Sequence, residues 1–309
     1  MVRHEEFSYA AQGFGAAIYA QLFIPDGEPR GVLQIAHGVN EYSGRYREFA
    51  LFLAERGFIV AANDHAGHGR SSSDAYPLGY FAPRHGYKCA LADMRTLYKT
   101  VSLRYPDAPY FLFGHSMGSF FAENYLSVYD DDLAGVILSG AGRQPRTVLL
   151  TGRVLASLIM LFKGRDYKSR LMVGLCFGGY NKKFDAATRL PVWLSRDGQI
   201  AAAYAADPYC RFRPAAEMIR QIFIAMADKD KRRHLRRVKK AQPLLFVSGA
   251  DDPVGGFGSG VSRIFSRYCK RGLTDVSLLL YPEGRHEMLN ELNKRQVYDD
   301  ILQWLEERV

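Results

Sequence analysis

The segment with the clearest chemistry is Gly114-His115-Ser116-Met117-Gly118, a G-x-S-x-G motif. The apolar run 110–113 before it predicts a strand, and the spacing of apolar residues after it predicts a helix. The two glycines leave room for a sharp strand-to-helix turn that lifts the serine hydroxyl above a sheet. This context favours Ser116 as a nucleophile; the alternative is a structural glycine turn with an incidental serine.

A nucleophilic serine needs a general base, and two of the eight histidines follow Ser116 in the chain. Where a serine sits on such a turn, the acid comes next along the chain and the histidine last. His234 lies in a run of lysines and arginines, where we expect a solvent-facing helix and where nearby cations disfavour a further charge. His286 directly follows the predicted strand 276–281. We therefore expect His286 to be the base, with an exposed loop histidine as the alternative.

The acid that orients the histidine should follow the predicted strand 243–247, where Asp251 and Asp252 both stand. Pro253 biases the backbone of Asp252 away from the helical region, as suits a residue at a strand-end turn. This favours Asp252 and leaves Asp251 as a local turn or cap residue.

An early loop supplies a candidate oxyanion hole. His37-Gly38-Val39-Asn40 follows the predicted strand 31–36, where the first backbone donor belongs. We expect the N–H groups of Val39 and Met117 to face the developing oxyanion; losing one such donor costs about 3 kcal/mol of barrier stabilisation.

A second glycine-rich loop spans residues 63–71 and lacks both the G-x-G-x-x-G spacing and the lysine of a phosphate-binding loop. We expect His65 and His68 to organise this loop beneath the site together with His37. Metal binding by these histidines is the less favoured interpretation, and the sequence calls for no metal and no cofactor.

The elements that would position these residues alternate between strand and helix. Apolar runs predict strands at 16–24, 31–36, 58–62, 110–113, 133–138, 243–247 and 276–281. Helical spacing appears at 45–56, at 87–105, after Ser116, at 259–269 and around 297–304. Such alternation predicts the α/β class, with a mostly parallel central sheet and helices on both faces.

The alternation stops after the strand at 133–138, and residues 141–240 contain no clear strand. Helical spacing at 148–162 and 171–177 and from 214 towards 238 predicts a mainly helical cap, or lid, inserted into the sheet domain, with a basic helix connecting back to it. The predicted domains are therefore a core of residues 1–140 and 241–309 and a cap of residues 141–240. The two apolar helices could line an acyl tunnel or form the core of the cap.

Charge is distributed unevenly along the chain. Residues 141–240 hold 22 basic and 7 acidic side chains, although the whole chain carries a net charge of +9. Cations at a helix end explain part of the run 229–240. We expect the cap to face an anionic substrate or an anionic membrane surface, with a merely soluble basic surface as the alternative.

The composition excludes several classes of protein. No apolar stretch is long enough to span a membrane, and charged residues near the N-terminus do not fit a secretory signal, so we expect a cytoplasmic protein. The four cysteines lie far apart and predict free thiols. The basic run lacks interleaved aromatic residues, so nucleic acid is not an expected partner.

These motifs resemble the monoacylglycerol lipase and lysophospholipase branch of the α/β-hydrolase superfamily. The resemblance rests on His37-Gly38, on Tyr42-Ser43-Gly44-Arg45-Tyr46, on Asp64-His65-x-Gly67-His68-Gly69-x-Ser71, on the Ser116 motif, on Gly249-x-x-Asp252 and on His286-Glu287. In that family the acid stands three residues after the glycine, which selects Asp252 over Asp251. The resemblance also implies that Val39 and Met117 form the oxyanion hole.

The predicted function is a serine hydrolase that cleaves carboxylic esters through an acyl-enzyme on Ser116, with a monoacylglycerol-like or lysophospholipid-like substrate. The alternatives are an acyltransferase or a peptidase that uses the same triad, or a non-catalytic binding protein on this fold. A peptidase is disfavoured because a cap that binds a peptide ammonium group should offer carboxylates, and this cap has few. Retention of all three triad residues disfavours the binding protein. The residues that bind the substrate are not identified by the sequence.

Overall fold

An eight-stranded sheet runs through the computed structural model, which describes residues 1–12, 15–185 and 187–309. Its spatial order is β1-β2-β4-β3-β5-β6-β7-β8. The first two strands are antiparallel to their neighbours and all other pairs are parallel. The strands are β1 (Arg3–Ala10), β2 (Ala17–Ile24), β3 (Gly31–Ala36), β4 (Phe58–Asn63), β5 (Tyr110–His115), β6 (Gly135–Ser139), β7 (Leu244–Gly249) and β8 (Val276–Tyr281).

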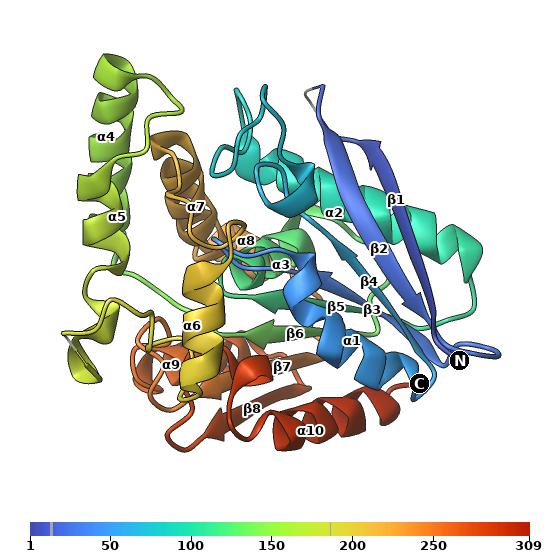
Figure 1. Cartoon of the computed structure of the whole chain (residues 1–309). Coiled ribbons are helices and arrows are strands. Elements are labelled where there is room, and N and C mark those ends of the chain that lie inside the picture. The colour runs from blue at the N-terminus through green and yellow to red at the C-terminus, as the bar shows by residue number, and fades with distance from the viewer. Residues whose placement is uncertain (13–14, 186) are drawn as a thin grey trace.

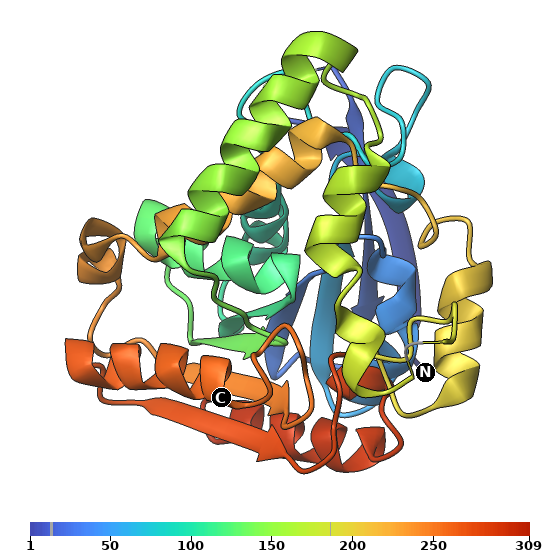
Figure 2. The same ribbon diagram turned by 90° about the vertical axis from the view of Figure 1, so that its left-hand side faces the viewer.

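Helices cover both faces of the sheet (Figures 1 and 2). Their packing against the sheet creates two apolar cores. One core is formed with α2 (Gly86–Arg104), α3 (Met117–Val128) and α9 (Ser259–Arg271), the other with α1 (Arg47–Ala54) and α10 (Lys294–Glu306). Successive strand residues point to opposite faces, so that in β3 Val32 enters the first core and Leu33 the second. Strands covered on both faces are buried along their whole length, which is why β3, β4 and β5 are mostly apolar in sequence.

Residues 140–243, between β6 and β7, form a helical segment that we call the insert. It contains α4 (Arg146–Lys163), α5 (Arg170–Phe177), α6 (Gly198–Ala206), α7 (Ala216–Lys229) and α8 (Arg232–Arg237). In Figure 1, α4 and α5 stand at the side of the molecule and α7 lies between them and the core. Two of these helices begin with a capping side chain, because Ser169 and Asp197 accept backbone hydrogen bonds from Met172 and Gln199.

The predicted α/β class is confirmed, but two local predictions were incomplete. The sequence pattern does not predict strand β1, because it is an edge strand whose residues are mostly polar. Its position is set by pairing along the whole of β2. The helical run from 214 towards 238 is two helices, α7 and α8. At the break, Lys229 pairs with Glu123 at 2.7 Å while Asp230 pairs with Arg143 and Arg267. Lys229, the first cation of the basic run, thus pairs with a carboxylate and also lies in the last turn of α7.

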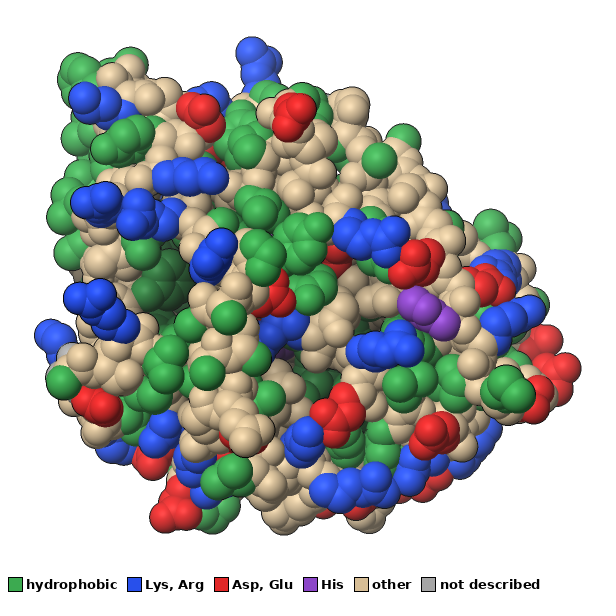
Figure 3. Space-filling model, viewed as in Figure 1, with side chains coloured by type: hydrophobic (Ala, Val, Ile, Leu, Met, Phe, Trp, Pro, Cys, Tyr) green, Lys and Arg blue, Asp and Glu red, His purple; other side chains and the backbone are tan. Residues whose placement is uncertain are grey.

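The outer surface of α4 and α5 is unusually apolar. Leu150, Val154, Leu158 and Leu161 recur at helical spacing along α4 and are all about half exposed or more. On α5, Leu171 and Leu175 are four positions apart and are also more than half exposed. Figure 3 shows hydrophobic side chains along the edge where α4 and α5 lie, with Lys and Arg side chains among them.

Candidate active site

Ser116 occupies the sharp turn between β5 and α3. Its backbone has φ 52° and ψ −114°, a conformation that a non-glycine residue adopts only when its surroundings impose it. Close packing holds the turn, since a Cβ atom added at Gly118 would lie 2.0 Å from the carbonyl oxygen of Ala36. The Ser116 N–H donates to the carbonyl of Ser139 at 2.9 Å, which ties the turn to the end of β6.

His286 and Asp252 meet in the loops that follow β8 and β7. His286 Nδ1 lies 3.0 Å from Asp252 Oδ2, and both side chains are buried. The other carboxylate oxygen of Asp252 accepts from the Val254 N–H at 2.8 Å. Asp251 instead pairs with Lys183 at 2.6 Å, so the structure brings Asp252 and not Asp251 to the histidine.

His234, the other histidine after Ser116, lies elsewhere. It is half-buried on α8 rather than facing solvent as expected, because its Nδ1 is 2.9 Å from Ser127 Oγ on α3. It is not among the residues that line the cavity at Ser116.

The pKa of His286 is raised above the ordinary value of 6.5. Burial by itself lowers it, but the adjacent Asp252 carboxylate favours the imidazolium, and together with smaller contributions from Glu287 and Glu41 it outweighs burial. His115, whose ring centroid is 4.7 Å from that of His286, shows the reverse: burial lowers its pKa to about 4. Of these two neighbouring histidines, His286 alone is therefore poised to accept a proton near neutral pH.

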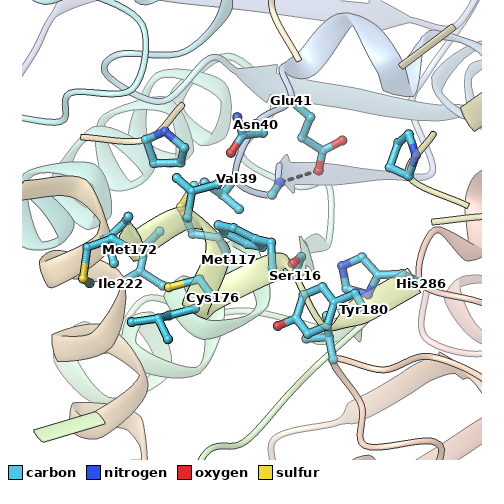
Figure 4. A pocket seen from close by; sticks show the side chains of 18 of the residues that line it. Val39, Asn40, Glu41, Ser116, Met117, Met172, Cys176, Tyr180, Ile222 and His286 are labelled. Carbon is cyan, nitrogen blue, oxygen red and sulfur yellow. Dashed lines mark hydrogen bonds between the residues drawn. The ribbon is translucent and has the colours of Figure 1, made fainter. Parts of the chain in front are cut away.

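The candidate oxyanion donors flank the serine. Val39 and Met117 line the same cavity as Ser116 and His286, and Figure 4 shows the four residues grouped together. Met117 opens α3, so its N–H belongs to the first turn and has no intrahelical acceptor. Neither N–H has a hydrogen-bond partner among the residues described. Asn40 follows Val39 with φ 59°, and its side-chain amide donates to the carbonyls of Cys210 and Phe212 in the insert.

A buried cluster of charges links the loop after β3 to the loop of His286. Arg45 donates to both carboxylate oxygens of Glu287, at 2.6 and 2.7 Å, and to Glu41 at 3.1 Å. Burial alone raises the pKa of Glu287, but Arg45 overcomes that effect and lowers it to about 2. Glu41 also accepts from the Gly38 N–H at 2.5 Å and from the Tyr46 hydroxyl at 2.8 Å. The cluster therefore fixes both loops relative to each other.

The three histidines of the loops after β3 and β4 pack against one another with tilted or edge-on rings. The ring centroid of His37 lies 4.3 Å from that of His65 and 5.0 Å from that of His68. The His65 N–H donates to His37 Nε2 at 2.9 Å. Burial lowers the pKa of His37 to about 4 and of His68 to about 3, so both rings stay neutral. Within the described part of the chain, no group of three or more His, Cys, Asp or Glu side chains is arranged to hold a metal ion.

The site opens into a cavity of about 790 Å³ between core and insert. On one side of Ser116 the wall is apolar and comes from α4, α5 and α7, with Met172, Cys176 and Ile222 among its residues (Figure 4). Both apolar helices that the sequence left undecided contribute side chains to this wall. The cavity is large enough to enclose most of a small amphiphilic ligand.

Sequence reasoning missed the insert residues that brace the histidine loop. The His286 N–H donates to the Trp193 carbonyl at 3.3 Å, and the Glu287 N–H donates to the Leu194 carbonyl at 2.7 Å. The ring centroid of Trp193 is 5.0 Å from that of His286. These are contacts between a non-helical segment and a loop far along the chain. The only feature of the sequence that hinted at these contacts is a tryptophan in a segment without helical or strand periodicity.

Comparison with known proteins identifies one family. Residues 27–293 match the model of the Hydrolase_4 family, described as serine aminopeptidase, S33.

Individual relatives match over nearly the whole chain. A monoacylglycerol lipase from Mycolicibacterium smegmatis is 29% identical over 303 residues, covering 97% of this chain and 96% of the relative. A monoglyceride lipase homolog from Monkeypox virus is 25% identical over 297 residues, covering 94% and 95%. The crystal structure of a thermostable carboxyl esterase from Bacillus coagulans, solved with glycerol, superposes with a TM-score of 0.90 at 29% identity, covering 100% of this chain and 99% of the esterase.

Proposed function

Since the chain belongs to the Hydrolase_4 family of S33 serine aminopeptidase type, we propose that it hydrolyses single-chain lipid esters through an acyl-enzyme on Ser116. The resemblance to the monoacylglycerol lipase-like branch of the α/β-hydrolases is confirmed, and the chain is a carboxylic ester hydrolase. One observation carries the mechanism: Ser116 and His286 line one largely apolar cavity, and His286 is hydrogen-bonded to the buried Asp252.

In the first half of the reaction, Ser116 Oγ attacks the ester carbonyl carbon. His286 Nε2 takes the hydroxyl proton, because Nδ1 carries its own proton towards Asp252 Oδ2. The Val39 and Met117 N–H groups stabilise the tetrahedral oxyanion. When the intermediate collapses, the bond from the acyl carbon to the alcohol oxygen breaks and His286 returns the proton to the leaving alcohol.

In the second half, water attacks the acyl carbon of the Ser116 ester. His286 again accepts the proton and Asp252 again stabilises the imidazolium. Collapse breaks the bond to Ser116 Oγ, which regains its proton, and the free acid departs. No atom outside the chain, the ester and water is required for this balance.

We assign residues 141–240 to a cap that binds the acyl chain. The apolar wall built by α4, α5 and α7 extends away from Ser116, so an acyl chain held there places its ester carbonyl at the serine. Burying each methylene of such a chain contributes about 0.8 kcal/mol. The cavity therefore favours esters with long acyl chains.

An aminopeptidase activity, which the family description suggests, fits this cavity poorly. Recognition of a peptide ammonium group needs a free carboxylate, and the two cavity-lining carboxylates, Glu41 and Glu287, are both bonded to Arg45. Acyl transfer would differ from hydrolysis in the acceptor alone.

We also propose that α4 and α5 rest on an anionic membrane surface. No helix in the described ranges is long and apolar enough to cross a membrane. The exposed apolar stripes of α4 and α5 are instead suited to shallow insertion, and the exposed cations Lys163, Lys168 and Arg170 at the turn between the helices complement anionic head groups. Such docking would bring lipid esters to the cavity that these helices line.

The decisive experiment compares wild type with Ser116→Ala on p-nitrophenyl esters and monoacylglycerols of increasing chain length. We expect a fluorophosphonate probe to label wild type once, at Ser116, and both labelling and turnover to vanish in the variant. Turnover should be highest for esters with long acyl chains. Folded wild-type protein that neither reacts with the probe nor cleaves any ester would refute the acyl-enzyme mechanism.

A further inference from the structure

Two arginines of the insert line the same cavity. Arg211 and Arg213 lie in the non-helical segment between α6 and α7, and both are exposed at the cavity. The segment begins in a turn, since the N–H groups of Cys210 and Arg211 both donate to the Asp207 carbonyl at 3.0 Å. Cys210 and Phe212 also line the cavity, but Cys210 is buried and the Phe212 ring packs at 5.5 Å against His68. The two arginines are therefore the exposed, charged residues of this part of the cavity wall.

The backbone that carries these arginines is fixed. The side-chain amide of Asn40 donates to the carbonyls of Cys210 and Phe212, and the Ala215 N–H donates to the Gly79 carbonyl at 2.8 Å. Asn40 directly follows Val39, a proposed oxyanion donor. The arginines thus keep a set position relative to the ester that reacts at Ser116.

The cavity has a charge that nothing within it balances. Its two carboxylates, Glu41 and Glu287, are already bonded to Arg45. Neither Arg211 nor Arg213 forms an ion pair with any described residue, whereas Arg143 and Arg196, also in the insert, pair with Asp230 and Glu291. Figure 3 shows Lys and Arg side chains beside a hollow with an apolar floor. Two cations without an ion-pair partner in the wall of an apolar cavity suit an amphiphile with an anionic head.

We infer that Arg211 and Arg213 bind the phosphate of the head group, so that the preferred ester is a single-chain phospholipid rather than a neutral monoacylglycerol. This inference rests on the proposed function. Guanidinium groups recognise phosphate through paired, charge-assisted hydrogen bonds. Arg211 and Arg213 lie two positions apart in the chain and line the same cavity, which lets both guanidinium groups reach one phosphate bound there. A glycerol head group offers hydroxyls but no charge for them.

The test measures kcat/KM for 1-oleoylglycerol, 1-oleoyl lysophosphatidic acid and 1-oleoyl lysophosphatidylcholine below their aggregation concentrations. The enzymes are wild type, the double variant Arg211→Gln/Arg213→Gln and the matched control Arg232→Gln/Arg236→Gln, whose arginines are exposed on α8 and do not line the cavity. We expect the Arg211/Arg213 variant to lose about 10- to 100-fold on both phosphate esters, as for the loss of charged hydrogen bonds. Its activity on 1-oleoylglycerol should change less than about 2-fold, since no charge is lost there.

Several outcomes would overturn the inference. Equal losses on all three esters, the same loss in the control variant, or no loss on the phosphate esters would each do so. Wild type that cleaves 1-oleoylglycerol and neither phosphate ester would refute the head-group assignment while leaving the proposed function intact. Failure on every ester, together with no fluorophosphonate labelling, would refute the proposed function itself.

Discussion

The insert has two parts that meet the rest of the molecule in different ways. Its inner part, residues 193–214, is bonded to the core at several points. Ser195 donates to the Asn290 carbonyl at 2.8 Å, Arg196 pairs with the buried Glu291 at 2.9 Å, and Asn40 holds the carbonyls of Cys210 and Phe212. Its outer part, α4 and α5, packs on α7 and turns an apolar face to solvent.

This difference separates the chemistry from the choice of substrate. The inner part supports the His286 loop and the Val39 loop, so it belongs mechanically to the catalytic core although it lies in the insert. The outer part supplies the apolar wall and the exposed stripes. We expect changes at the core and the inner part to alter rate constants or stability, and changes in the outer part to alter access of substrate and surface binding.

The largest effect should come from Asp252→Asn, which removes the carboxylate that sets the histidine tautomer. We expect kcat on a short soluble ester to fall by about 10⁴-fold with the fold retained. The neighbouring variant Asp251→Asn is the control, since it loses only a half-exposed pair with Lys183 and should stay within about 2-fold of wild type. A large loss in Asp251→Asn and none in Asp252→Asn would reverse the assignment.

The next largest effect should follow Arg45→Met, which leaves the buried carboxylates Glu41 and Glu287 without their cation. Breaking a buried pair in this way costs about 3–5 kcal/mol of unfolding free energy. Denaturant unfolding monitored by circular dichroism would measure it. Arg295→Met, which removes an exposed pair with Asp299, should change stability by less than about 0.5 kcal/mol. Similar values for the two variants would show that the cluster does not fix the loops.

The pH dependence of kcat/KM should report the pKa of the general base, His286. His286 must be neutral to accept a proton, and its pKa lies above 6.5, so log(kcat/KM) should fall with unit slope as pH drops through that raised pKa. The raised pKa of His286 affects stability in the opposite direction with pH: activity falls at low pH, whereas this contribution to stability falls at high pH. The folded protein holds the His286 proton more tightly than the unfolded chain, so this contribution is full below pH 6.5 and is lost as pH rises through the folded pKa. An acidic limb centred well below 6.5 would contradict the role of Asp252.

The smallest effect on the enzyme itself should come from the outer part. Leu158→Glu places a charge on the exposed stripe of α4 and should leave kcat on a soluble ester and stability nearly unchanged, within about 0.5 kcal/mol. We expect it to weaken binding to phosphatidylglycerol vesicles in a flotation assay. The matched control is Leu103→Glu, which changes an exposed leucine on α2, outside the insert. Equal vesicle binding by wild type and both variants would exclude α4 as the docking surface.

The sequence predicts the residues with local signatures and misses those defined by distant contacts. Ser116, Asp252 and His286 each follow a recognisable apolar strand, and the structure brings them to one place. Arg45 and Glu287 are separated by 242 positions, and nothing in either neighbourhood predicts that they pair. Likewise, Trp193 supports the His286 loop through its backbone carbonyl, which accepts a hydrogen bond from the His286 N–H far along the chain.

The place of the insert also bears on how the protein folds and diversifies. Strands β6 and β7 pair in parallel, with Val136 opposite Leu244, across the whole of residues 140–243. This contact is non-local, so we expect it to form late in folding. The entropic cost of closing a loop rises only logarithmically with its length, by about 0.6 kcal/mol for each doubling. The sheet therefore tolerates inserts of very different size at this point, and a lineage can replace its insert while the registers of β7 and β8 continue to deliver the acid and the histidine.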